Sequence, residues 1–276
     1  MRLFFIRHAE SVNNVASQHT NVINSPLTTH GAVQAHRLAD RLAKDAVISH
    51  VFSSPLTCCV RTAEAISDAQ NKVRGRSLNT IQLWELQGRE DTESGQKSTD
   101  ARSSRPKDEL SIDNSDWMHE MRLKANYFTD NYLIPLLCCD DENEMACAIV
   151  TQGNELNVLA KAFFDRIPRG DIILPPDPEK QGLIIDSSLV VFPPWAITGV
   201  LDVIVSPRSD STVVQQPTPK LPFQADIRRV NCRSHLEKLQ KARGGVGSAP
   251  FDEKQRTIHN FFTPLPQTPR PDDLNN

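Results

Sequence analysis

The sequence has no long apolar run. Its first apolar stretch, Leu3 to Ile6, has four residues, and no later stretch approaches the roughly 18 residues that a membrane span needs. So short a run is also below the length of a signal-peptide core. We therefore expect no membrane span and an intracellular, cytoplasmic protein.

An excess of basic charge and a regular cysteine spacing are also missing. The 276 residues carry a formal net charge of −3, which argues against a basic surface for nucleic acid. The six cysteines, at positions 58, 59, 138, 139, 147 and 232, form neither a zinc-ligand spacing nor a disulfide framework. We expect reduced thiols, no metal, and no direct binding of nucleic acid.

Strand and helix patterns alternate over residues 1–205. The patterns predict strands at 3–6, 47–52, 145–150, 182–192 and 199–205, and helices at 31–44, 54–70, 117–137 and 155–164. This alternation predicts an α/β fold, a three-layer α/β/α sandwich with a mainly parallel sheet. The polar stretch 91–116 has no apolar core of its own and is predicted to be an insertion.

The composition changes after residue 205. Residues 206–220 are rich in Pro, Ser, Thr and Gln, and the last thirty residues are polar and Pro-rich. We therefore predict one domain over 1–205 and a mostly flexible tail over 206–276. Within the tail, one amphipathic helix is predicted at 231–243.

An Arg-His pair follows the first strand. Arg7 and His8 stand where a buried strand ends, and the carboxyl ends of parallel strands are where α/β folds bind ligands. A neutral imidazole can attack phosphorus, and a guanidinium fork can hold two phosphate oxygens. A lone His after a strand is usually structural, but Glu10 and Asn14 follow closely. The pair therefore predicts a phosphate site with His8 as nucleophile and Arg7 as ligand.

Further segments accompany this pair in a fixed order. They are Ser25-Pro26-Leu27-Thr28 with Gly31, Phe52-Ser53-Ser54-Pro55-Leu56, and Arg61-Thr62-Ala63. In this order the chain resembles the histidine phosphatase superfamily, which includes phosphoglycerate mutases and many mutase-like phosphatases of fungi. The resemblance covers residues 1–205. It implies the phosphoglycerate mutase-like sandwich, a phosphohistidine intermediate at His8 and chemistry without a cofactor.

The resemblance assigns roles to two more residues. Leu83-Trp84-Glu85 matches the Leu-x-Glu segment of the family, which implies that Glu85 gives the proton to the leaving oxygen. A Glu at the edge of a polar insertion is equally well explained as a solvated surface residue. Asn14 is expected to contact the phosphate or to brace the loop after His8.

Two positions depart from the family pattern. Cys58 stands where the motif Ser-Ser-Pro-Leu-x-Arg has its arginine, and Gln152 stands where Ser-His-Gly has its histidine. Arg61 lies one helical turn after Cys58, so it can replace the missing arginine as a phosphate ligand or be an ordinary exposed helix residue. Gln152 can donate hydrogen bonds but carries no positive charge. Two independent losses would lower the rate by about 10⁴ to 10⁶, although such effects seldom add.

These departures leave three hypotheses open. The first is a slow phosphomonoesterase for a phosphorylated small molecule or a phosphoprotein. The second is a catalytically lapsed phosphatase fold that serves as a binding module. The third is phosphotransfer of the phosphoglycerate mutase type.

The tail contains a second motif at 255–262. Gln255 is followed by Ile258, Phe261 and Phe262, a spacing similar to the PIP box, the peptide by which replication and repair proteins dock on the sliding clamp PCNA. One helical turn can gather the three apolar side chains into a plug. The same side chains can also fold back onto the domain. PCNA is thus a candidate partner, and nuclear residence follows only if the motif is functional.

Overall fold

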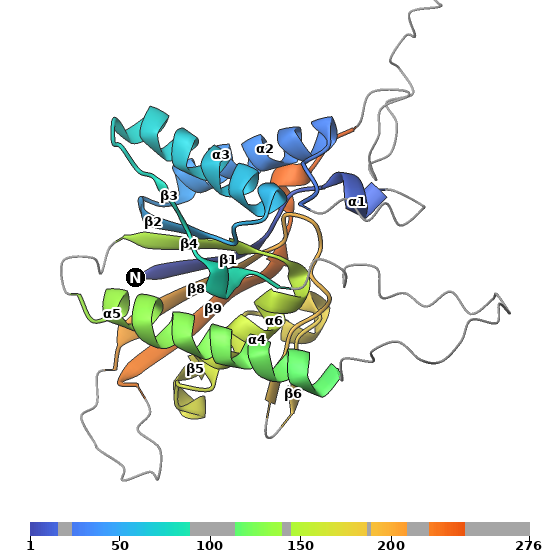
Figure 1. Cartoon of the computed structure of the whole chain (residues 1–276). Coiled ribbons are helices and arrows are strands. Elements are labelled where there is room, and N and C mark those ends of the chain that lie inside the picture. Colours follow the sequence, from blue (N-terminus) through green and yellow to red (C-terminus); the bar gives the residue numbers. More distant parts are fainter. Residues whose placement is uncertain (16–23, 89–113, 140–144, 187–188, 209–220, 241–276) are drawn as a thin grey trace, which may run out of the picture.

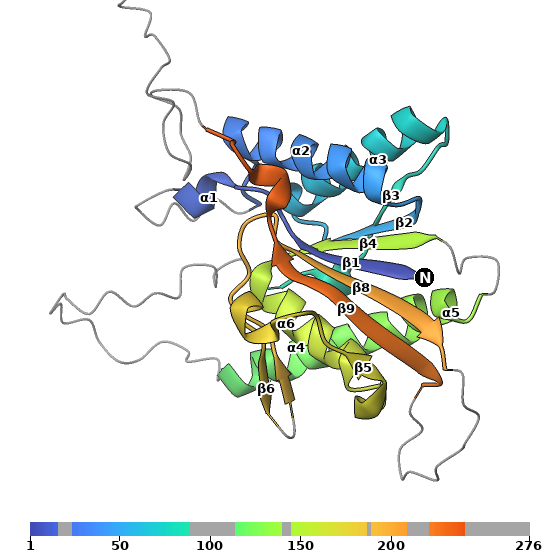
Figure 2. The ribbon, with the colours of Figure 1, turned by 180° about the vertical axis from the view of Figure 1, so that it is seen from behind.

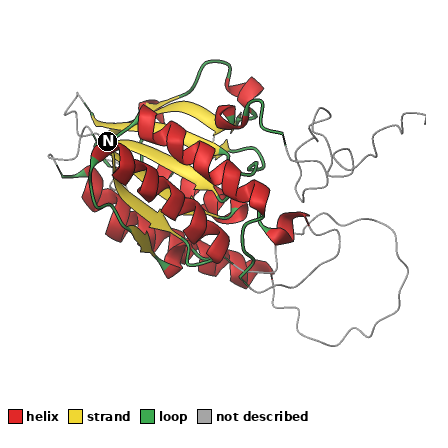
Figure 3. Cartoon of the chain, turned by 90° about the horizontal axis from the view of Figure 1, so that it is seen from above, coloured by secondary structure: helices red, strands yellow, loops and turns green. Residues whose placement is uncertain are grey.

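A mainly parallel sheet lies between two layers of helices. The computed structural model describes residues 1–15, 24–88, 114–139, 145–186, 189–208 and 221–240. Figure 1 shows α2 (Thr29–Asp45) and α3 (Thr57–Arg74) on one face of the sheet, and α4 (Asn114–Phe128) and α6 (Gly153–Phe164) on the other. Figure 3, the view from above, shows helices lying over the strands of the sheet. The three-layer α/β/α sandwich predicted from the sequence is confirmed.

The seven strands follow the order β3-β2-β4-β1-β8-β9-β5. They are β1 (Arg2–Arg7), β2 (Ile48–Ser53), β3 (Thr80–Gln82), β4 (Ala146–Thr151), β5 (Ile172–Ile173), β8 (Val200–Pro207) and β9 (Phe223–Cys232). Strands β1, β2, β3 and β4 run parallel, and β8 is antiparallel to both β1 and β9. The pair β6 (Ile184–Asp186) and β7 (Leu189–Val191) forms a separate antiparallel sheet where a single strand was predicted.

Short helical elements complete the described chain. They are α1 (Val12–Val15), η1 (Trp84–Leu86), the π-helical η2 (Thr129–Leu133), α5 (Ile134–Leu137), η4 (Arg169–Asp171), η5 (Pro178–Gln181) and η6 (Ser234–Leu236). Within the described ranges, none of the helices is both long enough and apolar enough to cross a membrane.

Strand β1 is buried on both faces. Leu3 and Phe5 face the α4 and α6 layer, and the Phe5 ring lies 5.9 Å from the ring of Phe163. Phe4 and Ile6 face the α2 and α3 layer. Successive side chains of a strand point to opposite faces, so a continuous apolar run is what a central strand of a covered sheet requires. This strand therefore fixes the position of the residues that follow it.

Strand β9 belongs to the sheet. Its register with β8 extends from Pro207 opposite Phe223 to Val200 opposite Cys232, and Figure 2 shows the two strands side by side. The domain boundary predicted near residue 205 is therefore too early. Charged residues along this strand obscure its apolar alternation in the sequence. The helix predicted at 231–243 is wrong for residues 231–240, the part that the structure describes, because the chain there continues as strand β9 and then forms η6.

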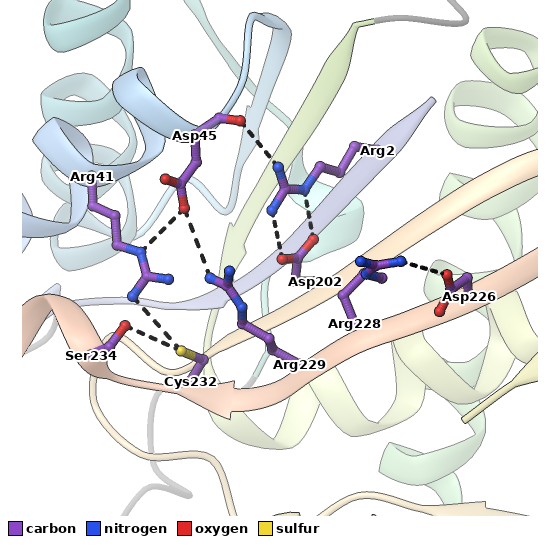
Figure 4. A network of polar contacts seen from close by, with 9 residues as sticks. All are labelled: Arg2, Arg41, Asp45, Asp202, Asp226, Arg228, Arg229, Cys232 and Ser234. Carbon is purple, nitrogen blue, oxygen red and sulfur yellow. Dashed lines mark hydrogen bonds and ion pairs between the residues drawn. The ribbon is translucent and has the colours of Figure 1, made fainter. Parts of the chain in front are cut away.

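An ion-pair network ties β9 to α2 (Figure 4). Arg2 donates two hydrogen bonds of 2.7 Å to the carboxylate of Asp202, and a third, of 3.1 Å, to the carbonyl of Asp45. The carboxylate of Asp45 pairs with Arg41 at 3.2 Å and with Arg229 at 3.8 Å. Strands β1, β8 and β9 are thus joined to the end of α2.

Candidate functional site

The carboxyl ends of β1 and β4 meet at one edge of the sheet. The parallel register places Arg7 opposite Thr151, and the backbone N–H of His8 donates to the Thr151 carbonyl at 3.1 Å. Gln152 follows directly and is buried at the start of α6. The structure therefore brings together three of the predicted residues, Arg7, His8 and Gln152.

The ring of His8 is fully buried and has a defined orientation. Its Nδ1 lies 2.7 Å from the carbonyl oxygen of Ala9. Because a carbonyl oxygen only accepts, Nδ1 carries the hydrogen, and a neutral ring then has its lone pair on Nε2. Ala9 in turn donates its N–H to Thr62 Oγ1 on α3, at 3.0 Å. In the neutral ring this hydrogen bond therefore leaves the lone pair on Nε2, the nitrogen that the predicted nucleophilic role of His8 requires.

The loop after His8 is anchored to the start of α2. Glu10 is fully buried, accepts from the Thr28 hydroxyl at 2.8 Å, and donates its N–H to Gln34 Oε1 at 3.0 Å. Thr28 also caps α2 by accepting from the N–H of Gly31 at 2.8 Å. These contacts hold the loop after His8 against the start of α2.

Asn14 braces the same loop. Its Oδ1 accepts hydrogen bonds of 2.9 Å from both the N–H and the hydroxyl of Ser11. Bracing is one of the two roles expected for this residue, and its position fits that role.

Arg7 contacts a loop that lies far from it in the sequence. Its Nη1 donates to the carbonyl of Trp195 at 2.6 Å. We call residues 193–199 the brace loop. On the other side, a β-carbon at Gly153 would lie 3.6 Å from the Nε of Arg7. Arg7 therefore lies beside the N-terminus of α6, where the helix dipole adds partial positive charge that favours an anion.

Cys58 and Arg61, the arginine predicted to replace the missing ligand, lie on different faces of α3. Cys58 is buried in the α3 layer and shares a helix face with Thr62, whose hydroxyl donates to the Cys58 carbonyl at 2.7 Å. Arg61 is on another face: its side chain is 66% exposed and forms an ion pair of 2.9 Å with Glu64. The structure therefore does not bring Arg61 to His8, and its role as a phosphate ligand stays a prediction.

Glu85 lies on η1, at the rim of a narrow cavity. Thr151 and Glu155 line the same cavity. Partial burial and then the Glu85 carboxylate raise the pKa of Tyr132, which places the carboxylate near η2. The role of Glu85 as proton donor stays a prediction.

Sequence reasoning missed Glu155, Thr62 and the brace loop. Glu155 is buried in the first turn of α6, where a carboxylate is stabilised by the helix dipole, and its position shortly after Gln152 was the available signal. Thr62 lies in the segment Arg61-Thr62-Ala63, and its hydroxyl was not predicted to have a role at the site. The brace loop acts through backbone groups, which leave no signal in the sequence.

Two predicted features lie outside the described residues. One is the clamp-binding motif at 255–262, and the other is the insertion at 91–116, apart from its last three residues. Within the described ranges, no group of three or more His, Cys, Asp or Glu side chains could hold a metal ion.

Sequence comparisons relate this chain to known proteins. The sequence model described as histidine phosphatase superfamily (branch 1) matches residues 3–165. The chain is 26% identical over 263 residues to a probable phosphatase of Schizosaccharomyces pombe, a match that covers 94% of this chain and 79% of the relative. A shorter match, 39% identical over 69 residues, covers 25% of this chain and 32% of a probable phosphoglycerate mutase of Proteus mirabilis.

One solved structure supports the fold. A mycobacterial glucosyl-3-phosphoglycerate phosphatase aligns with a TM-score of 0.51 and 14% identity, covering 83% of this chain and 98% of the other. At this identity the likeness shows the shared fold alone.

Proposed function

Because the chain belongs to the histidine phosphatase superfamily (branch 1), we propose that it is a phosphomonoesterase that acts through a phosphohistidine at His8. The observation that carries the proposal is the adjacency of Arg7 and His8 to the N-terminus of α6, with the Nδ1 of His8 engaged by the Ala9 carbonyl. This arrangement supplies a nucleophile and an anion-binding wall at the same edge of the sheet.

The reaction has two steps. The Nε2 of His8 attacks phosphorus while the bond from phosphorus to the substrate oxygen breaks, and the leaving oxygen takes a proton from the carboxylic acid of Glu85. A water molecule then attacks the phosphohistidine, gives a proton back to Glu85, and releases inorganic phosphate. Arg7 and Gln152 donate to the phosphate oxygens, and Asn14 holds the loop.

The expected turnover is slow. Cys58 and Gln152 replace two cationic ligands of the family pattern, and losing one preorganised donor typically lowers a rate by about 10² to 10³. The substrate class is a phosphorylated small molecule or a phosphoprotein. The short match to a probable phosphoglycerate mutase supports phosphotransfer of the mutase type as a weaker alternative.

A second candidate function rests on Arg61. Its ion pair with Glu64 at the surface leaves Arg7 as the one predicted arginine ligand at the site within the described residues. This favours a lapsed phosphatase fold that binds a partner. In that case docking on PCNA through Gln255, Ile258, Phe261 and Phe262 would make the protein nuclear, whereas the phosphatase is proposed to be cytoplasmic.

Turnover of an aryl phosphate separates the two functions. The variants are His8→Ala and the double mutant Cys58→Arg/Gln152→His, which restores the family's ligands. Wild-type turnover that disappears in His8→Ala supports the phosphatase. Turnover seen only in the double mutant refutes it and supports the lapsed binding module.

A further inference from the structure

The brace loop makes three contacts with the Arg-His pair. The Trp195 carbonyl accepts from the guanidinium of Arg7 at 2.6 Å, and the Gly199 carbonyl accepts from the Arg7 backbone N–H at 3.1 Å. The Thr198 N–H donates to the carbonyl of His8 at 3.2 Å. The orientation of both predicted phosphate-contacting residues therefore depends on where this loop lies.

One side chain bonds to peptide groups on both sides of Trp195. The Oδ1 of Asn231 accepts from the N–H of Ala196 at 2.9 Å, and its Nδ2 donates to the Pro194 carbonyl at 3.0 Å. The fit is close, since a β-carbon at Gly199 would lie 2.0 Å from that Oδ1. The Asn231 amide thus fixes the peptide segment that presents the Trp195 carbonyl.

The backbone at Asn231 has the left-handed conformation, with φ of 50°. Few residues other than Gly and Asn adopt it without strain, and Asn adds an amide that can donate and accept at once. Asn231 lies near the end of β9, so the position of that strand determines where the Asn231 amide holds the brace loop.

We propose that Asn231 is a positioning residue for Arg7 and His8, an inference that rests on the proposed phosphatase function. It touches neither the substrate nor the reacting atoms. It sets the direction of the Trp195 carbonyl, and that carbonyl sets the plane of the Arg7 guanidinium. Misplacing a substrate-positioning group by about 1 Å can cost about 10²-fold in rate, so the amide matters to turnover as well as to stability.

A second anchor keeps the loop folded without this amide. The indole N–H of Trp195 donates to Asn157 Oδ1 on α6 at 2.8 Å. Loss of the Asn231 amide is therefore expected to loosen the loop locally while the fold survives. Such a change lowers kcat and weakens phosphate binding with a modest effect on the unfolding temperature.

Three variants of the full chain test the role. Asn231→Gly removes the amide at a left-handed position that glycine tolerates. Asn231→Asp keeps an acceptor for the Ala196 N–H and loses the donor to Pro194. Asp177→Gly is the matched control, because Asp177 also has a φ of 50° but lies on an exposed turn where its carboxylate pairs with Lys180 at 2.9 Å.

The measurements are kcat and KM for an aryl phosphate, the affinity for inorganic phosphate, and the thermal unfolding temperature. For Asn231→Gly we expect kcat to fall by about 10- to 100-fold, with partial recovery in Asn231→Asp and wild-type values in Asp177→Gly. A kcat near that of the wild type in Asn231→Gly would overturn the proposal. So would a loss that matches the unfolded fraction at the assay temperature.

Phosphate affinity separates failure of this inference from failure of the proposed function. If the wild-type protein binds phosphate but shows no turnover, the phosphatase proposal fails, and weaker phosphate binding by Asn231→Gly still supports the positioning role. Equal phosphate affinity in wild type and Asn231→Gly overturns the positioning role. A wild-type protein that neither binds phosphate nor turns over the aryl phosphate overturns both.

Discussion

Thr62 on α3 accepts a hydrogen bond from the backbone N–H of Ala9, the residue that follows His8, at 3.0 Å. Both residues are fully buried, so this N–H has no access to water as a substitute acceptor. The contact joins α3 to the loop that orients the His8 ring.

Thr62→Val removes this acceptor while keeping the shape of the side chain. We expect the free energy of unfolding to fall by about 1–3 kcal/mol, because the Ala9 N–H is left unsatisfied. Turnover should also fall, since Ala9 supplies the carbonyl that holds Nδ1 of His8. Denaturant unfolding and kcat measure the two effects. Thr62→Ser, which keeps the hydroxyl, should stay close to wild type in kcat, and an equal kcat loss in both variants would contradict the hydrogen-bond explanation.

Gly31→Ala tests the packing of the same loop on α2. A β-carbon at Gly31 would lie 2.0 Å from the carbonyl oxygen of Glu10, so helix or loop must shift. We expect a loss of about 1–3 kcal/mol in the free energy of unfolding, and lower turnover as the loop moves. Gly170→Ala is the matched control, because no heavy atom beyond Gly170 and its neighbours in the chain lies within 4 Å of the added β-carbon. Equal unfolding midpoints for the two variants would contradict the close approach.

Glutamine substitutions at Arg7 and at Arg61 test which of these two predicted phosphate ligands contributes to turnover. Arg61→Gln should leave turnover near the wild-type value and change the free energy of unfolding by less than about 1 kcal/mol, because it removes an exposed ion pair. Arg7→Gln should lower kcat/KM by about 10² to 10³, because it removes a cation at the site. A large loss of turnover in Arg61→Gln would show that this side chain leaves Glu64 and reaches the phosphate.

His235 makes the stability of the domain depend on pH. Burial, and then the charges of Arg41 and Arg233, lower the pKa of His235 from 6.5 to about 4, and its Nε2 lies 2.9 Å from the hydroxyl of Thr198. Between pH 6.5 and about pH 4, His235 binds a proton more readily in the unfolded chain than in the folded chain. The free energy of unfolding should therefore decrease as the pH falls from about 6.5 to about 4, by up to about 3 kcal/mol.

The variant His235→Gln provides the control for this pH effect. Glutamine can bond to Thr198 and does not titrate, so its free energy of unfolding should decline less over the same range. Unfolding curves at several pH values give the comparison. Parallel pH dependence in the two proteins would contradict the assignment to His235.

The central strands and the Arg-His pair could be predicted because their signals are local. The run from Leu3 to Ile6 is apolar on both faces, and the site residues follow it directly in the chain. The parallel pairing of β1 with β4 is enough to place Gln152 beside His8. The fold class was predictable for the same reason.

The end of the domain could not be predicted in this way. In β9, the inward residues Ala225, Ile227 and Val230 are separated by charged ones, and two register irregularities interrupt the pairing with β8. The contact of Arg7 with the carbonyl of Trp195 spans 188 residues and uses a backbone atom. Such contacts follow from the tertiary fold, so side-chain patterns do not indicate them.

The most direct test of the central claim is to look for a phosphoryl group on His8 during turnover. The protein is mixed with a labelled phosphomonoester, quenched under alkaline conditions that preserve phosphohistidine, and digested for peptide mass spectrometry. The account predicts one labelled residue, His8, and no label in His8→Ala. Turnover without label on His8, or the same label in His8→Ala, would contradict it.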